Sequence, residues 1–219
     1  MMRVATVIAL AVLSGCAAAP VEMVYLPEDR APGSRLVWPG PPEVPRLAYA
    51  GELIGEENFR AVEGQRDGAA LRMLRWIAGI GREKGVRELI RPQSGMVDES
   101  GRILVTDAGR EAVVVFDESA GELNFWAEAE RGRSFQSPVG IAADGEGGFL
   151  VADADIGYVL RLTRDGEPAG SIGAGLLERP TGLCRSDVSG EIFVADSAAH
   201  DIKVFNTAGR LLRNMGGRG

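Results

Sequence analysis

An internal repeat decides which folds are open to this chain. Three segments each open with a proline and then contain a Val-x-Asp tripeptide, and the aspartates of these tripeptides lie 46 and 43 residues apart, at Asp107, Asp153 and Asp196. A unit of this size cannot bury its apolar side chains alone, so consecutive units must stack on one another. The repeat therefore predicts an architecture of similar units packed side by side.

Each unit is predicted to form four short strands. In the third unit, apolar runs at 192–194, 202–205 and 210–215 are separated by turns that hold Gly or Asp, which is typical of short antiparallel strands. Helical repeats have similar periods, but no unit shows a long 3.6-residue periodicity. The sequence predicts an all-β fold, a β-propeller with about three four-stranded blades over residues 91–219.

The third unit also resembles a known repeat family. Its segment VADSAAHDIKVFNTAGRLLRNMG resembles the core of the NHL repeat, with matching residues at Asp196, His200, Ile202, Val204, Phe205 and Gly209. The asparagine that usually precedes the histidine is Ala199 here. The first two units have Glu111 and Gly157 in place of the histidine.

NHL propellers typically have six blades, so the resemblance implies that this chain supplies half of a ring. Residues 45–53 resemble the fourth strand of a further blade. An open stack would leave apolar blade flanks uncovered. We expect either a truncated chain or a homodimer in which two copies complete a six-bladed ring.

The repeated aspartates Asp107, Asp153 and Asp196 are interpreted as structural, because a carboxylate at a strand end accepts N–H groups of a neighbouring turn. His200 is interpreted as a turn residue of the same kind. A metal or catalytic cluster is the alternative, but a single histidine in the chain argues against a zinc site. Calcium, which needs only oxygen ligands, stays open. We expect no cofactor and no catalytic residue, and we expect Cys184 to be a buried free thiol.

The N-terminus is predicted to be a secretory signal over residues 1–15. Arg3 precedes an apolar run at 4–13 that is too short to span a bilayer. The run ends in Leu13-Ser14-Gly15-Cys16, which resembles a bacterial lipobox. The resemblance implies acyl chains on Cys16 and, because Ala17 and not Asp follows, the periplasmic side of the outer membrane in a Gram-negative host. An ordinary signal peptide is the alternative.

Two segments are expected between the signal and the blades. Residues 16–45 contain seven prolines and are predicted to be an extended tether, with 38–42 either docking on the blades or serving as a polyproline ligand. Residues 46–90 are predicted to hold a lone strand and an amphipathic helix at 67–81. That helix either packs on the propeller or rests on the membrane.

The charge balance bears on function. The net charge is −7, which argues against a nucleic-acid partner. We expect a membrane-anchored lipoprotein whose propeller is a binding scaffold for an envelope protein, a peptide or a glycan. The alternatives are a propeller enzyme of the metal-dependent lyase or hydrolase type and an inactive truncated remnant.

Overall fold

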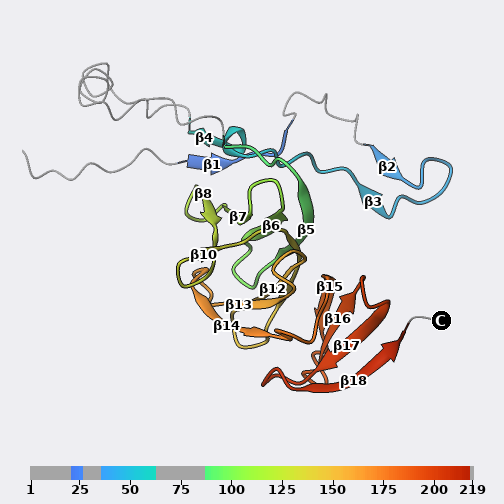
Figure 1. Ribbon diagram of the computed structural model, residues 1–219. Helices are drawn as coiled ribbons and strands as arrows, with labels where there is room; N and C mark the ends of the chain where they lie inside the picture. The colour runs from blue at the N-terminus through green and yellow to red at the C-terminus, as the bar shows by residue number, and fades with distance from the viewer. Residues whose placement is uncertain (1–20, 27–35, 63–86, 218–219) are drawn as a thin grey trace, which may run out of the picture.

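The computed structural model describes residues 21–26, 36–62 and 87–217 (Figure 1). The predicted signal, Cys16 and the predicted helix at 67–81 lie outside these residues. In the described parts the chain is almost entirely β-structure, with one short 3-10 helix at Glu56–Asn58. A search of the same parts for a helix long and apolar enough to cross a bilayer finds none.

The repeat region forms three four-stranded antiparallel sheets, and in each sheet the strands follow the order of the chain. The first sheet consists of β5 (Pro92–Val97), β6 (Ile103–Asp107), β7 (Ala112–Asp117) and β8 (Glu122–Trp126). The second consists of β11 (Pro138–Ala143), β12 (Phe149–Asp153), β13 (Tyr158–Leu162) and β14 (Pro168–Ile172). The third consists of β15 (Pro180–Arg185), β16 (Ile192–Asp196), β17 (Asp201–Phe205) and β18 (Leu211–Gly216). These are propeller blades, so the predicted all-β propeller fold is confirmed.

The turn after each Val-x-Asp tripeptide has a left-handed residue at the same place. Four positions beyond the aspartate lie Glu111 (φ 53°), Gly157 (φ 85°) and His200 (φ 59°). A positive φ costs a side-chain-bearing residue more than it costs glycine. The position at which the NHL repeat has its histidine therefore lies in a tight turn in all three blades, whichever residue stands there.

The blades are held together by apolar side chains between adjacent sheets. Alternate residues of a strand point to opposite faces of its sheet, and both faces of the second blade are buried. Its Phe149 and Leu160 pack toward the first blade, whereas Leu150 and Val159 pack toward the third. None of these four side chains is more than 2% exposed. Burial of both faces holds the second blade between the first and the third.

A two-stranded sheet from the N-terminal part covers the outer flank of the first blade. β1 (Val21–Met23) pairs with β4 (Phe59–Ala61). Met23 packs against Val114 and Phe116 of the blade, and the rings of Phe59 and Phe116 stack with 6.2 Å between their centroids. Residues 21–23 were expected to belong to the tether. They carry no proline, so their N–H groups are free to pair.

A hairpin in the N-terminal part extends away from the blades (Figure 1). β2 (Val37–Trp38) pairs with β3 (Leu47–Ala48), so the strand expected to complete a further blade pairs instead within its own N-terminal segment. Trp38, expected to dock or to be a polyproline ligand, is 50% exposed. The remaining strands, β9 (Glu128–Glu130) and β10 (Arg133–Ser134), form a hairpin between the first and second blades.

Candidate functional site

The repeat aspartate of the second blade is enclosed by backbone N–H groups. Asp153 is fully buried. Its carboxylate accepts hydrogen bonds from the N–H groups of Gln136 and Ser137, at 2.8 and 3.0 Å, just before the blade's first strand. It also accepts from Asp155 and Ile156 in its own turn, at 3.1 and 2.9 Å. One side chain thus joins the entry of the blade to the turn between its second and third strands.

The other two repeat aspartates have the same environment. Asp107 accepts from the backbone of Ile90, Arg91, Gly109 and Arg110. Asp196 accepts from the backbone of Glu178, Arg179 and Ala199. Each carboxylate therefore serves its own blade, and the structure does not bring the three together in one site. His200 lies exposed in its turn.

A buried lysine distinguishes the third blade from the other two. Lys203 is nearly buried, and its ammonium lies 2.9 Å from Asp196 and 2.8 Å from Asp201. Burial raises the pKa of Asp196, but hydrogen bonds from the Glu178 and Arg179 N–H groups and from Lys203 outweigh this and lower the pKa to about 2. Burial lowers the pKa of Lys203, yet its two carboxylate partners raise it overall. The cluster is fully paired, and Lys203 lies opposite Val194 on the face of the third blade that packs against the second.

Metal ligands do not gather within the described residues. No group of three His, Cys, Asp or Glu side chains there could hold a metal ion. Cys184, expected to be buried, is a free and exposed cysteine on the outer flank of the third blade. Its neighbours across the sheet, Phe193 and Val204, lie on the face that points away from the second blade. No further sheet of the described chain packs on that face.

A concave surface runs over the first strands of all three blades. A groove of about 490 Å³ is formed at the beginnings of β5, β11 and β15, within the volume range of small-molecule sites. Its lining mixes apolar and hydrogen-bonding groups. The lining residues are Gln93, Ser94, Val139, Gly140, Ile141, Ala154, Arg179, Thr181, Gly182 and Leu183.

The polar groups of the groove are held in place. Arg179 at the rim forms an ion pair with Asp155 of the preceding blade, with 2.9 Å between Nη1 and Oδ1. The hydroxyl of Thr181 donates to the carbonyl of Ala195 at 3.3 Å. Gly182 borders open space, because an added Cβ would meet only the Cβ of Ala195, at 4.0 Å. The groove therefore combines a cation, hydroxyl groups and accessible backbone.

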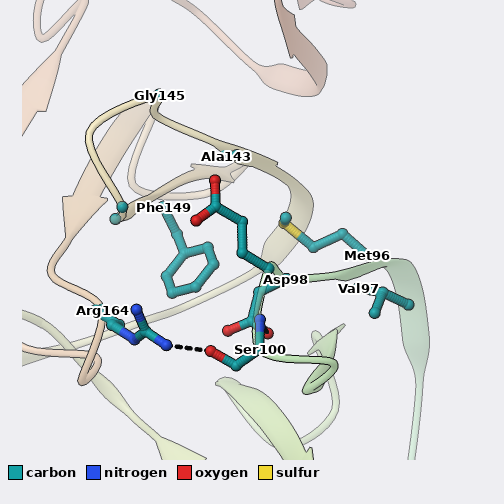
Figure 2. Close-up of a pocket in the computed structure, with 11 residues that line it drawn as sticks. Met96, Val97, Asp98, Ser100, Ala143, Gly145, Phe149 and Arg164 are labelled. Carbon is teal, nitrogen blue, oxygen red and sulfur yellow. Dashed lines mark hydrogen bonds between the residues drawn. The ribbon is translucent and has the colours of Figure 1, made fainter.

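A smaller pocket lies between the first two blades, toward the other end of β5 and β11 (Figure 2). Its apolar lining includes Met96, Val97 and Phe149, and at its edge Arg164 donates a hydrogen bond to Ser100. The volume is about 100 Å³, below the range of small-molecule sites. This pocket has room for no more than a single side chain, so the groove is the candidate site.

The residues of the groove were not singled out from the sequence. Arg179 and Thr181 flank the proline that opens the third unit, and Gln93 and Ser94 follow the proline of the first. Arg179 corresponds to Arg91 of the first unit, but the two residues after each proline differ between the units: Gln93-Ser94, Val139-Gly140 and Thr181-Gly182. A signal was present in that difference, since side chains that vary within a repeating framework are free to serve a ligand.

Comparison with known proteins does not identify a family. No family model matches the sequence, and no curated protein matches it. Solved structures with a similar course of the chain include a virginiamycin B lyase from Staphylococcus aureus, at 13% identity and a TM-score of 0.49. A structure of a nidogen/laminin complex has 17% identity and a TM-score of 0.49. A gluconolactonase from Xanthomonas campestris has 21% identity and a TM-score of 0.46.

These similarities are partial in both directions. The matches cover 58%, 62% and 64% of this chain, and 42%, 56% and 51% of the lyase, the complex chain and the gluconolactonase. The chain thus spans about half the length of the structures it matches. Similarity at this level carries no argument about activity. The assignment of the fold rests on the three four-stranded sheets themselves.

Proposed function

We propose that this protein is a binding scaffold that holds an extended peptide segment, or an extended segment of an envelope protein, in the groove over β5, β11 and β15. The observation that carries the proposal is the composition of the groove. Three blades contribute to one concave surface, which is lined by apolar side chains together with hydroxyl, amide and guanidinium groups. The strand-end aspartates, the other candidates for chemistry, are occupied by backbone N–H groups.

The lining favours a peptide over a glycan. An extended peptide offers backbone N–H and C=O groups together with side chains that alternate in direction. The hydroxyl groups of Thr181 and Ser94 and the exposed backbone at Gly182 can form hydrogen bonds with a peptide backbone. Val139 and Leu183 can contact the apolar side chains of a peptide. The lining contains no aromatic side chain on which a sugar ring could stack. A cofactor is not needed for such binding, and its absence remains a prediction.

Filling the groove tests this proposal. Gln93→Trp places a large side chain at an exposed position of the groove lining, whereas Val188→Trp changes a turn residue that is 99% exposed and outside the groove. On an array of random synthetic peptides, we expect Gln93→Trp to weaken peptide binding at least roughly ten-fold, about 1.4 kcal/mol. Val188→Trp should bind like the unmodified protein.

The outcomes on a parallel glycan array are equally decisive. Glycan binding that is lost in Gln93→Trp would identify a sugar as the ligand and overturn the proposed peptide. Peptide binding that is equal in both tryptophan variants would remove the groove as the site. Circular dichroism of both variants establishes that the sheets are intact.

We further propose that the protein is exported and anchored by acyl chains on Cys16, at the periplasmic face of the outer membrane if the host is Gram-negative. The lipobox-like sequence and the short apolar run that precedes it support this proposal. Several acyl chains bind a bilayer far more firmly than one, because each buried CH₂ contributes about 0.8 kcal/mol. The anchor would hold the groove near other envelope proteins.

The anchor is tested by Cys16→Ser in cells. We expect the unmodified protein in the membrane fraction and the variant in the soluble exported fraction. Ser14→Ala, which keeps a small residue before the cysteine, is the matched control and should remain membrane-bound. Membrane association of Cys16→Ser equal to that of the control would contradict lipid anchoring.

A further inference from the structure

A polar pocket of about 280 Å³ lies between the first two blades and shares no residue with the groove. It is formed by β7 and β8 of the first blade, by the start of β6, and by the turn between β13 and β14 of the second blade. Both of its walls therefore belong to the described chain. The lining residues are Arg102, Val115, Asp117, Asn124, Phe125, Trp126 and Asp165.

The equivalent space between the second and third blades is bridged by an arginine. Counted from the repeat aspartates, Val115 corresponds to Arg161, whose guanidinium donates to the carbonyl of Thr207 in the third blade. Between the first two blades, the bridge starts from another place: Arg102 donates to the carbonyl of Arg164, at 2.8 Å. The short side chain of Val115 therefore leaves room where Arg161 crosses to the next blade.

The polar side chains of the pocket also differ from those at the next interface. Asn124 corresponds to Gly170, because the two residues pair with equivalent positions of the preceding strand. Asp165 corresponds to Ala208, counted from the repeat aspartates. The second interface is thus built without these polar groups, so stacking of the blades does not require them.

Two charged side chains of the pocket are held in place and keep unused hydrogen-bonding atoms. Arg102 pairs with Asp98, with 2.8 Å between Nε and Oδ2, and its Nη1 makes no hydrogen bond within the described residues. Oδ1 of Asp117 accepts from the Ser119 hydroxyl and the Ala120 N–H, at 2.7 and 2.9 Å, which leaves Oδ2 available. Burial raises the pKa of Asp117, but these two hydrogen bonds and the charge of Arg102 outweigh it and lower the pKa. Asp117 is therefore an ionised acceptor.

Three further residues complete the pocket. Trp126 is half-buried, and its ring centroid lies 5.7 Å from that of Phe149. Gly166 of the second blade lies so close to the indole that an added Cβ would collide with it. Asn124 and Asp165 are exposed, and their side chains have no hydrogen-bond partner in the parts of the chain that the structure describes. A fixed aromatic residue thus adjoins an amide and a carboxylate that are available to a ligand.

The mixture of donors and acceptors determines the class of ligand. An anion would be repelled by Asp117 and Asp165, and a cation would be repelled by Arg102. The two carboxylates are too few for a metal ion. A hydroxyl group both donates and accepts, so a ligand with neighbouring hydroxyls can satisfy the carboxylates, the amide and the guanidinium together. The volume lies just below the roughly 300 Å³ at which small-molecule sites begin, which suits a single sugar ring.

We propose that the polar pocket binds one sugar unit, the end of a glycan, as a second site beside the peptide groove. Asp117 and Asp165 accept hydrogen bonds from its hydroxyls, and bonds to ionised acceptors are the stronger kind. Arg102 and Asn124 donate to other oxygens of the sugar, and Trp126 contacts its C–H groups. Because pocket and groove share no residue, either site can fail its test without the other.

An array of mono- and oligosaccharides, probed with the full chain carrying Cys16→Ser, tests this proposal. The variant Asn124→Ala/Asp165→Ala removes two exposed polar side chains of the pocket. Its control, Glu122→Ala/Glu167→Ala, removes two exposed carboxylates from the same strand and the same turn, outside the pocket. We expect the bound sugars to bind at least roughly ten-fold more weakly to the pocket variant, because it lacks two hydrogen-bonding groups, and unchanged to the control.

Three outcomes on this array would overturn the proposal. The first is that no sugar binds above background, and the second is equal weakening in the two double variants. The third is that sugar binding is lost in the groove variant Gln93→Trp and kept in the pocket variant, which would place the sugar in the groove. A failure of the peptide proposal alone leaves the sugar results of the pocket variant and its control unchanged.

Fluorescence of Trp126 gives a second readout at the pocket itself. The other tryptophans of the sequence are Trp38 and Trp76, so Trp38→Phe/Trp76→Phe leaves Trp126 as the only one. Titration with the sugar that binds most strongly on the array should change the emission of Trp126 until the site is saturated. Emission that stays constant while the same sugar binds would place the sugar outside the pocket and overturn the proposal.

Discussion

Asp153→Ala is expected to lower the free energy of unfolding by about 4 kcal/mol, a large part of the stability of a domain of this size. The substitution removes an acceptor that serves four backbone N–H groups, those of Gln136, Ser137, Asp155 and Ile156. Buried donors without an acceptor cost about 1–3 kcal/mol each. The loss is shared between the entry of the second blade and the turn between its second and third strands.

Urea denaturation followed by circular dichroism measures this effect. Asp144→Ala is the matched control, because Asp144 also accepts two backbone N–H groups, at 2.7 and 2.9 Å, but lies in a partly exposed turn where water replaces the lost acceptor. We expect it to cost about 1 kcal/mol. Asp153→Asn keeps one acceptor oxygen and should fall between the two. Equal losses for Asp153→Ala and Asp144→Ala would show that the repeat aspartate has no special structural role.

The blades could be predicted from the sequence because their signals repeat. The Val-x-Asp tripeptides, the glycine turns and the strand lengths occur three times, so chance agreement at one unit does not matter. The two-stranded sheets β1–β4 and β2–β3 have no such repetition. Their strands are two or three residues long, and whether Val21–Met23 is a tether or a strand depends on Phe59–Ala61, a partner 38 residues away that local sequence does not reveal.

Burial explains where single residues were mispredicted. Cys184 was expected to be buried because free cysteines usually are. Its position is buried only when a further sheet packs on the same flank, and the described chain has none there. The groove was missed for a related reason: Arg179 and Thr181 come together with Gln93 only because three first strands lie side by side. The distance between them along the chain carries no signal of that proximity.

Lys203→Val is expected to destabilise the protein by about 3–5 kcal/mol, although valine suits the position. The corresponding residues are Val114 in the first blade and Leu160 in the second, opposite Val105 and Val151. The cost arises because the substitution leaves Asp196 and Asp201 buried side by side without their cation. The interface between the second and third blades therefore depends on a paired charge where the preceding interface is apolar.

The double variant Lys203→Val/Asp201→Ala separates charge from packing. It reproduces the pattern of the first blade, where Ala112 lies opposite Asp107 and Val114 follows two residues later. Asp196 then keeps its bonds from the Glu178 and Arg179 N–H groups. We expect the double variant to unfold within about 1.5 kcal/mol of the unmodified protein. A double variant as unstable as the single one would show that the lysine stem, and not its charge, stabilises the interface.

The free energy of unfolding at acidic pH shows whether Lys203 stabilises the ionised form of Asp196. The pKa of Asp196 lies at about 2 in the folded state against an ordinary value of 3.8, so its contribution is complete above about pH 4 and is lost as the pH falls toward 2. A difference of this size corresponds to about 2 kcal/mol. Without the ammonium of Lys203, the pKa of Asp196 moves back toward its ordinary value, and the acid-dependent loss must become smaller. If urea unfolding at pH 4 and pH 2 shows the same loss with and without Lys203, the lysine does not stabilise the ionised aspartate.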